Sequence, residues 1–344
     1  MKIKGKMSIL LILLLCFSLV LTACGAKQES SKEKNEVSGQ EEEKKVKFRF
    51  AHVMPIDHPE HEAAIRMANL LKEKTNGRIT VEVYPASQLG GSRELMTSVI
   101  NGTVEMVSTS TFGTINSNLL VVELPYLFKN FDHVSKFTKS EMSKQLLESL
   151  NGQGVHGMGF WTVGFRNIGN TKRLVEKPED LKGLLIRAFE NEMLKDTLNA
   201  LGANVTVLPY PEVYMALQTG TIDGEENPYV NTYAMKFFEP EKYKTETRHL
   251  NNFEIVVSNI KWWDSLAEKD QEIIMETFNE ATEFYMELQK EADLKYKQLL
   301  IDEGMKVTEI SDYQPWIAAV KPVYDKWEPK LGKELIEKIR SLGW

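Results

Sequence analysis

Arg187 carries the most informative chemistry in this sequence. The apolar run Leu184-Leu185-Ile186 predicts a short strand that ends at this arginine. A guanidinium is a planar fork that can hold a carboxylate with two parallel hydrogen bonds, and it stays charged at any relevant pH. At a strand end it can project into a ligand cleft and hold a carboxylate there. For an isolated arginine, a surface ion pair is the favoured alternative.

Other polar residues give weaker signals of catalysis or metal binding. Glu225 and Glu226 are adjacent carboxylates, but no nucleophile stands near them. His58 and His61 are three residues apart, a pattern that favours surface or capping histidines over a metal pair. The chain contains no glycine-rich phosphate loop, Gly-x-Ser-x-Gly elbow, His-Glu-x-x-His motif or EF-hand loop. We therefore expect a binding protein without cofactor or metal, not an enzyme.

Alternating strands and helices are predicted to position these residues. Strands are expected over residues 46–51, 79–84 and 106–109, with helices over 59–74 and 93–100 between them. The second half repeats this order, with strands over 184–187 and 205–208 and helices over 191–201 and 211–218. Such alternation is typical of an α/β fold with parallel strands, which binds ligands at the carboxyl ends of those strands.

The folded part is long enough for two lobes with a cleft between them. Roughly 300 residues exceed what one core usually encloses. We expect lobe I to comprise residues 46–163 and about 254–292, and lobe II residues 164–253 and about 293–344. Residues 266–303 predict one long helix that braces both lobes. Dimerisation through this helix is the alternative, but no sustained heptad is visible, so we expect a monomer.

The N-terminal segment predicts export. Lys2, Lys4 and Lys6 precede an apolar run of about 13 residues, which is too short for a stable membrane-spanning helix. Small residues then lead into Cys24, so residues 1–23 form the expected signal peptide. Removal of these three lysines lowers the formal net charge from −7 to −10. A chain this acidic is a poor partner for nucleic acid.

The segment Leu21-Thr22-Ala23-Cys24-Gly25 resembles the bacterial lipobox, which implies that Cys24 is diacylated. Cys16 leaves with the signal, so the mature chain keeps no free thiol for disulfides, zinc or nucleophilic catalysis. Residues 24–45 are mostly polar and predict a disordered tether. The expected location is extracytoplasmic, on the outer face of the bacterial cell membrane.

Several long motifs occur in an order and spacing that resemble the DctP family of TRAP solute-binding proteins, over roughly residues 47–330. The motifs are Tyr84-Pro85-Ala86-Ser87-Gln88-Leu89-Gly90, Leu124-Pro125-Tyr126-Leu127-Phe128, Phe165-Arg166-Asn167, Lys177-Pro178-Glu179-Asp180-Leu181-Lys182-Gly183-Leu184-Leu185-Ile186-Arg187 and Pro211-Glu212-Val213-Tyr214-Met215-Ala216-Leu217-Gln218-Thr219-Gly220-Thr221-Ile222-Asp223-Gly224-Glu225-Glu226-Asn227-Pro228. The resemblance implies a two-lobe, periplasmic-binding-protein-like α/β fold, often called a Venus flytrap.

The resemblance also implies a set of ligand-binding residues. Arg187 falls on the family's carboxylate-binding arginine, and Arg166 on its second arginine. One extra residue separates these arginines relative to some relatives, which affects the register of Arg166. The further contact positions are Asn227, Tyr210, Ser110, Glu190 and His52. For Arg166 the alternative role is a structural salt bridge, and for Tyr210 it is core packing.

The function implied by the resemblance is capture of a small organic acid, a C4-dicarboxylate or a sugar acid such as a uronate. The expected partners are the small and large integral membrane subunits of a TRAP transporter, with the membrane itself reached through the lipid anchor. The alternatives are a ligand-binding accessory protein of a sensor system and a sugar-acid lyase. The sequence does not identify the acid.

Overall fold

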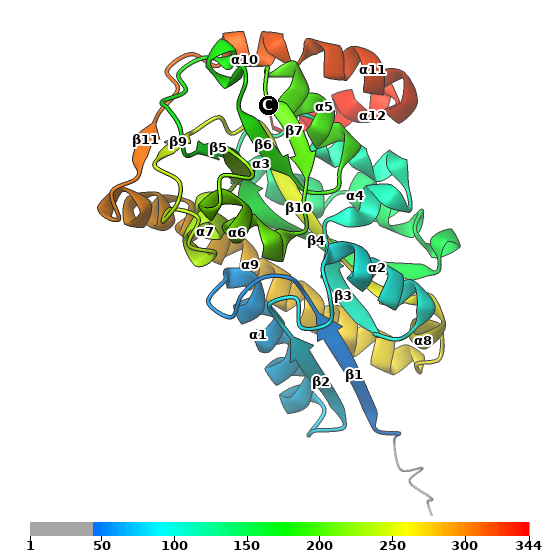
Figure 1. The fold of residues 1–344 in the computed structure, drawn as a ribbon. Helices are drawn as coiled ribbons and strands as arrows, with labels where there is room; N and C mark the ends of the chain where they lie inside the picture. The colour runs from blue at the N-terminus through cyan, green and yellow to red at the C-terminus, as the bar shows by residue number, and fades with distance from the viewer. Residues whose placement is uncertain (1–43, 344) are drawn as a thin grey trace, which may run out of the picture. The chain divides into compact units, whose positions relative to one another are not determined.

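The computed structural model describes residues 44–343, so the predicted signal peptide, Cys24 and nearly all of the tether lie outside the described residues. Within this range the strands form two sheets (Figure 1). The strands are β1 (Val46–Ala51), β2 (Ile79–Tyr84), β3 (Met106–Thr109), β4 (Val155–Phe165), β5 (Asn167–Asn170), β6 (Leu185–Ala188), β7 (Asn204–Val207), β8 (Gly224–Asn227), β9 (Tyr243–Thr245), β10 (Asn251–Asn259) and β11 (Lys306–Thr308).

Helices cover both sheets, and their ends follow local capping chemistry. At the start of α1, His58 accepts a hydrogen bond from the backbone N–H of Glu60 at 3.1 Å. The helices are α1 (Pro59–Lys74), α2 (Ser92–Asn101), α3 (Phe131–Thr138), α4 (Glu141–Glu148), α5 (Glu192–Ala200), α6 (Val213–Gln218), α7 (Tyr229–Ala234), α8 (Ile260–Asp264), α9 (Glu268–Asp302), α10 (Gln314–Ala319), α11 (Lys321–Leu331) and α12 (Lys333–Ser341).

The first sheet has the strand order β2-β1-β3-β10-β4. β1 pairs in parallel with β2 and β3, as the sequence predicts, whereas β10 pairs antiparallel with β3 and β4. Helices α1 and α9 pack on this sheet through a core that contains Phe50, Trp161 and Phe278. The carboxyl ends of β1 and β3 therefore lie at one edge, together with the first residues of β10.

The second sheet has the order β11-β9-β5-β8-β6-β7. β6 pairs in parallel with β7 and β8, while β5 pairs antiparallel with β8 in a register that sets Asn167 opposite Asn227. β5 consequently begins where β8 ends. This register brings Arg166, which immediately precedes β5, to the same sheet edge as Asn227.

The two sheets are joined by the long helix α9 and at the points where the chain passes directly from one sheet to the other. Only Arg166 separates β4 of the first sheet from β5 of the second. Helix α9 contacts α1 and β4 on the first sheet's side and α7 on the second's (Figure 1). The fold is therefore the predicted two-lobe α/β fold with a helix that braces both lobes. The residue boundaries given above for the lobes remain a prediction.

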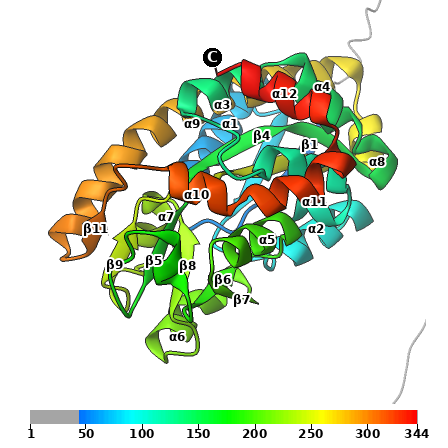
Figure 2. The same ribbon diagram turned by 90° about the horizontal axis from the view of Figure 1, so that it is seen from above.

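The C-terminal helices α10 to α12 form a further tie, which follows an arc across the molecule in Figure 2. In α11, the Tyr324 hydroxyl donates to the Pro125 carbonyl oxygen at 2.8 Å. The Trp327 indole donates to Asp196 of α5 at 2.7 Å. This segment thus contacts the connection between β3 and β4 of the first sheet and the helix α5 between β6 and β7 of the second. Among residues 44–343, no helix is long and apolar enough to cross a membrane.

Candidate functional site

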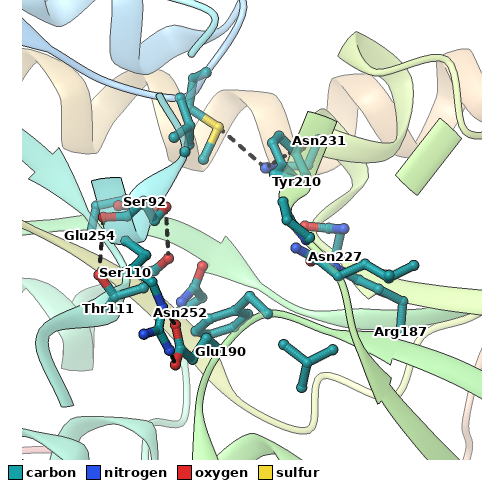
Figure 3. A pocket seen from close by; sticks show the side chains of 18 of the residues that line it. Ser92, Ser110, Thr111, Arg187, Glu190, Tyr210, Asn227, Asn231, Asn252 and Glu254 are labelled. Atoms are coloured by element: carbon teal, nitrogen blue, oxygen red, sulfur yellow. Dashed lines mark hydrogen bonds and ion pairs between the residues drawn. The ribbon is translucent and has the colours of Figure 1, made fainter. Parts of the chain in front are cut away.

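A cavity of about 260 Å³ lies where the facing edges of the two sheets meet. This volume suits a small ligand, since pockets for drug-sized molecules begin near about 300 Å³. In Figure 3, Ser92, Ser110 and Thr111 lie on one side and Arg187, Tyr210 and Asn227 on the other. The cavity is lined by Val53, Met54, Gly91, Ser92, Arg93, Glu94, Ser110, Thr111, Arg166, Arg187, Phe189, Glu190, Val207, Leu208, Pro209, Tyr210, Asn227, Asn231, Asn252 and Glu254.

Arg187 supplies a buried positive charge to this cavity. The side chain is 2% exposed, and its Nε donates a hydrogen bond to the Leu208 carbonyl oxygen at 2.9 Å. Burial lowers the pKa of Arg187 to about 10, so the guanidinium is still protonated at neutral pH. Within the described part of the chain, no carboxylate forms an ion pair with Arg187, and its two terminal nitrogens make no hydrogen bond.

Arg166 also lines the cavity, but a carboxylate of the protein already occupies its guanidinium. Nε and Nη2 both donate to the Glu226 carboxylate, with Nη2 at 2.7 Å from Oε1, and Nη1 donates to Asn252 Oδ1 at 2.9 Å. Nη2 also donates to the Glu226 carbonyl oxygen. Of the five N–H groups of an arginine, one on Nη1 is left without a partner among residues 44–343. Arg166 therefore forms a buried salt bridge at the cavity wall.

The electrostatics of Glu226 support this assignment. Burial acts to raise the pKa of Glu226, but the charge and hydrogen bonds of Arg166, together with the nearby His249, outweigh burial and lower the pKa to about 2. His249 Nε2 lies 3.3 Å from Glu226 Oε2. Glu226 is thus ionised and neutralises Arg166. The neighbouring Glu225 instead pairs with the buried Lys244 at 2.7 Å and accepts from the Asn227 side-chain amide.

Four other predicted contact residues line the cavity. Asn227 is held at the end of β8 by Glu225, and the hydroxyl of Tyr210 accepts a hydrogen bond from Asn231 at 3.0 Å. Ser110 follows β3 and lies 3.5 Å from the hydroxyl of Ser92. Glu190 lies across the cavity from α2 and forms a bidentate ion pair with Arg93 of that helix, in which Arg93 Nε lies 2.7 Å from Glu190 Oε2. The fold therefore brings Arg187, Arg166, Asn227, Tyr210, Ser110 and Glu190 to one cavity.

The structure places His52 outside the cavity, contrary to the predicted ligand contact. Its side chain is fully buried against α1, with Nε2 3.2 Å from His61 Nδ1. Burial, with the charges of His61 and His58, lowers the pKa of His52 to about 3. The residues that reach the cavity from this loop are Val53 and Met54. The strand end directs His52 toward the helix instead, so it contributes to the packing of lobe I.

Sequence reasoning missed the cavity residues that β10 and α2 supply. Asn252 and Glu254 lie on β10, and Ser92 and Arg93 lie in the first turn of α2. The sequence contains a signal for Asn252 and Glu254. The strand Asn251-Asn252-Phe253-Glu254-Ile255-Val256-Val257 places three polar side chains in an otherwise apolar run, and all are buried. Buried polar residues of this kind are common at binding sites.

Comparison with known proteins gives the family. A profile described as "Bacterial extracellular solute-binding protein, family 7" (DctP) matches residues 50–330, and the chain belongs to this family. The C4-dicarboxylate-binding periplasmic protein DctP of Rhodobacter capsulatus is 32% identical over 86% of this chain and 90% of its own. The 2,3-diketo-L-gulonate-binding periplasmic protein YiaO of Escherichia coli is 30% identical over 76% of this chain and 80% of its own.

Solved structures of TRAP periplasmic solute-binding proteins have the same fold. The protein from Shewanella oneidensis with bound succinate has a TM-score of 0.84 and 30% identity, over 87% of this chain and all of that chain. The protein from Polaromonas bound to D-erythronate has a TM-score of 0.83 and 28% identity, over 86% and 99% of the two chains. These four relatives are named as binding proteins. Among residues 44–343, no group of three or more histidine, cysteine or acidic side chains is arranged to hold a metal ion.

Proposed function

We propose that this chain is the extracytoplasmic solute-binding subunit of a TRAP transporter and captures a small organic acid in the cavity between its two sheets. One observation carries the proposal: Arg187 is a buried, protonated guanidinium that lines the cavity and has no carboxylate partner within residues 44–343. An unpaired buried charge costs several kcal/mol, which an anionic ligand offsets. The identity of the relatives as binding proteins of organic acids agrees with this reading.

The mechanism follows from charge pairing across two lobes. The ligand carboxylate binds to the terminal nitrogens of Arg187, with Asn227 and Tyr210 beside it on the second sheet. Contacts from Ser92, Ser110 and Thr111 then reach the ligand from the first sheet. Because these contacts come from both lobes, the ligand favours their approach and excludes water, which strengthens its ion pair. The membrane subunits of the transporter would receive the acid from this complex.

A thermal-shift screen of organic acids tests this function. An acid at 100 times its dissociation constant should stabilise the protein by about 2.7 kcal/mol. Neutral sugars of the same size serve as controls, because they lack the carboxylate that Arg187 is proposed to bind. Stabilisation by one or more acids and by no neutral sugar is the expected result. Failure of every acid tested to stabilise the protein would contradict the proposed function.

We also propose that Cys24 is lipidated and anchors the chain to the outer face of the membrane. Support comes from the lipobox-like sequence and from the polar residues that follow it. Substitution of Cys24→Ser should leave the protein unprocessed or release it from the membrane fraction, as fractionation and immunoblotting would show. A processed, membrane-bound Cys24→Ser variant would contradict lipidation but would leave acid binding unaffected.

A further inference from the structure

The charged groups of the cavity define the class of acid that it accepts. We propose that the ligand is a monocarboxylic acid with hydroxyl groups on its chain, in preference to a dicarboxylic acid. This proposal rests on the function proposed above. The charged side chains that already have partners decide between these two classes of acid.

Three arginines line the cavity, and no lysine or histidine does. Arg93 is paired with Glu190, and Arg166 is paired with Glu226. Arg187 is the remaining cation, without an ion-pair partner in the described residues. The cavity therefore provides one unneutralised positive charge, which matches one carboxylate. A second buried carboxylate would lack a compensating cation, and an uncompensated buried charge is strongly unfavourable.

Glu254 indicates which ligand group is recognised at the end of the cavity opposite Arg187. Its side chain is 2% exposed and lines the cavity from β10, and neither carboxyl oxygen makes a hydrogen bond within residues 44–343. Burial, followed by the charges of Glu60 and Glu123, raises its pKa well above the usual range. A carboxyl in this setting retains its proton and can both donate and accept a hydrogen bond. A ligand hydroxyl, which also donates and accepts, is the matching group.

Neighbouring side chains extend this neutral polar surface. The hydroxyls of Ser92, Ser110 and Thr111 lie on the same side as Glu254 (Figure 3). Glu190, an acid paired with Arg93, and Glu94 are the other carboxylates of the lining. This end thus presents hydroxyl and carboxyl groups where a dicarboxylate would place its second negative charge. An acid with several hydroxyls fits these groups, whereas an alkyl chain would leave them without partners.

Acids of matched size separate the requirement for hydroxyl groups from the requirement for a single carboxylate. Four acids have four carbons each: butyrate has neither hydroxyls nor a second carboxylate, succinate has the second carboxylate, D-erythronate has hydroxyls, and tartrate has both. D-Gluconate and D-glucarate form a six-carbon pair that differs only in the second carboxylate. In calorimetric titrations of the mature protein, D-erythronate or D-gluconate should bind at least tenfold more tightly than every diacid of its own length and than butyrate.

The outcomes distinguish the class of acid from organic-acid capture itself. Binding of succinate, tartrate or D-glucarate as tight as that of the hydroxylated monoacid of the same length would overturn this inference and leave organic-acid capture standing. Binding of butyrate equal to that of D-erythronate would overturn the role of the hydroxyls. If none of the acids bound, the proposed function would fail together with the inference.

Variants of Glu254 test the residue itself. Glu254→Gln keeps a neutral group that donates and accepts, so binding of the hydroxylated monoacid should change by less than about fivefold. Glu254→Leu removes the hydrogen bonds and should weaken that binding at least tenfold, while any binding of butyrate stays unchanged. Thermal melts establish that both variants fold. If folded Glu254→Leu binds the hydroxylated acid like the wild type, Glu254 does not contact it and the inference is wrong.

Discussion

At the scale of single residues, Arg166 and Arg187 share a sheet edge but differ in their partners. The sequence predicted the place of Arg187, because a short apolar strand ends there, and an ordinary α/β topology directs strand ends to the ligand. It left a structural salt bridge as the alternative role of Arg166 but did not single out Glu226 as its partner. That pairing depends on the antiparallel register of β5 and β8, which is set by contacts far apart in the chain.

Glu60 allows a prediction about pH at this scale. It lies buried in the first turn of α1, and burial raises its pKa from 4.5 to about 7. Glu254 and Tyr285 are the ionisable groups that interact electrostatically with it. Between these two pKa values the unfolded state has lost the proton and the folded state keeps it. Stability contributed by this residue is therefore greatest below about pH 4.5 and falls as the pH rises to about 7.

The variant Glu60→Gln removes this titration. Between pH 5 and 7 the free energy of unfolding of the wild type should fall, relative to the variant, by up to about 1.4 kcal/mol per pH unit. Urea unfolding of both proteins at several pH values gives the comparison. A constant offset between the two curves reflects other effects of the substitution. If the difference does not vary with pH, Glu60 is not the neutral buried acid described here.

At the scale of elements, local signals predicted the first strand and the first helix well. The expected strand over residues 46–51 and helix over residues 59–74 coincide with β1 and α1. The long strands β4 and β10 were not predicted. All nine residues of β10 are buried, so the strand lacks the alternation of polar and apolar residues that marks a half-exposed strand. Its antiparallel place in a sheet with parallel strands is a property of the whole fold.

The contact between β4 and α9 gives a prediction for these elements. A Cβ added at Gly159 of β4 would lie 2.6 Å from the ring of Phe278 on α9. Phe278 is 1% exposed and stacked on Trp161, so it has little room to move. Overpacking of a core in this way costs about 1–3 kcal/mol. Gly159→Ala should therefore lower the free energy of unfolding by about that amount.

Gly152 provides the matched control for this substitution. No atom lies within 4 Å of a Cβ added there, so Gly152→Ala should change stability by less than about 0.5 kcal/mol. Chemical denaturation of the two variants beside the wild type measures both effects. Equal stability of the two alanine variants would mean that α9 does not pack rigidly on β4.

At the scale of the whole molecule, the two-lobe fold was predicted from length, alternating elements and the family's motifs. The cavity composition was predicted less completely. Six of the seven expected contact residues line it, but the side contributed by β10 and α2 was missed: β10 is remote in sequence from the motifs, and Ser92 and Arg93 of α2 follow a motif without any signal of their own for ligand contact. The tie made by α11 to both sheets likewise had no local signal in the sequence.

Calorimetric titration of Arg187→Lys tests whether this guanidinium binds the ligand carboxylate. Lysine keeps the charge but cannot reproduce the planar pair of hydrogen bonds to one carboxylate. Loss of one partner of a buried charge pair commonly costs about 2–5 kcal/mol, so affinity for the acid with the largest thermal shift should fall roughly 30-fold or more. The control is Arg66→Lys, a substitution on α1 in a surface ion pair with Glu280, remote from the cavity lining.

We expect a large loss of affinity for folded Arg187→Lys and wild-type affinity for Arg66→Lys. Circular dichroism establishes the folded state of each variant. Near-native binding by folded Arg187→Lys would contradict the proposed site, because the ligand carboxylate would then lie away from Arg187.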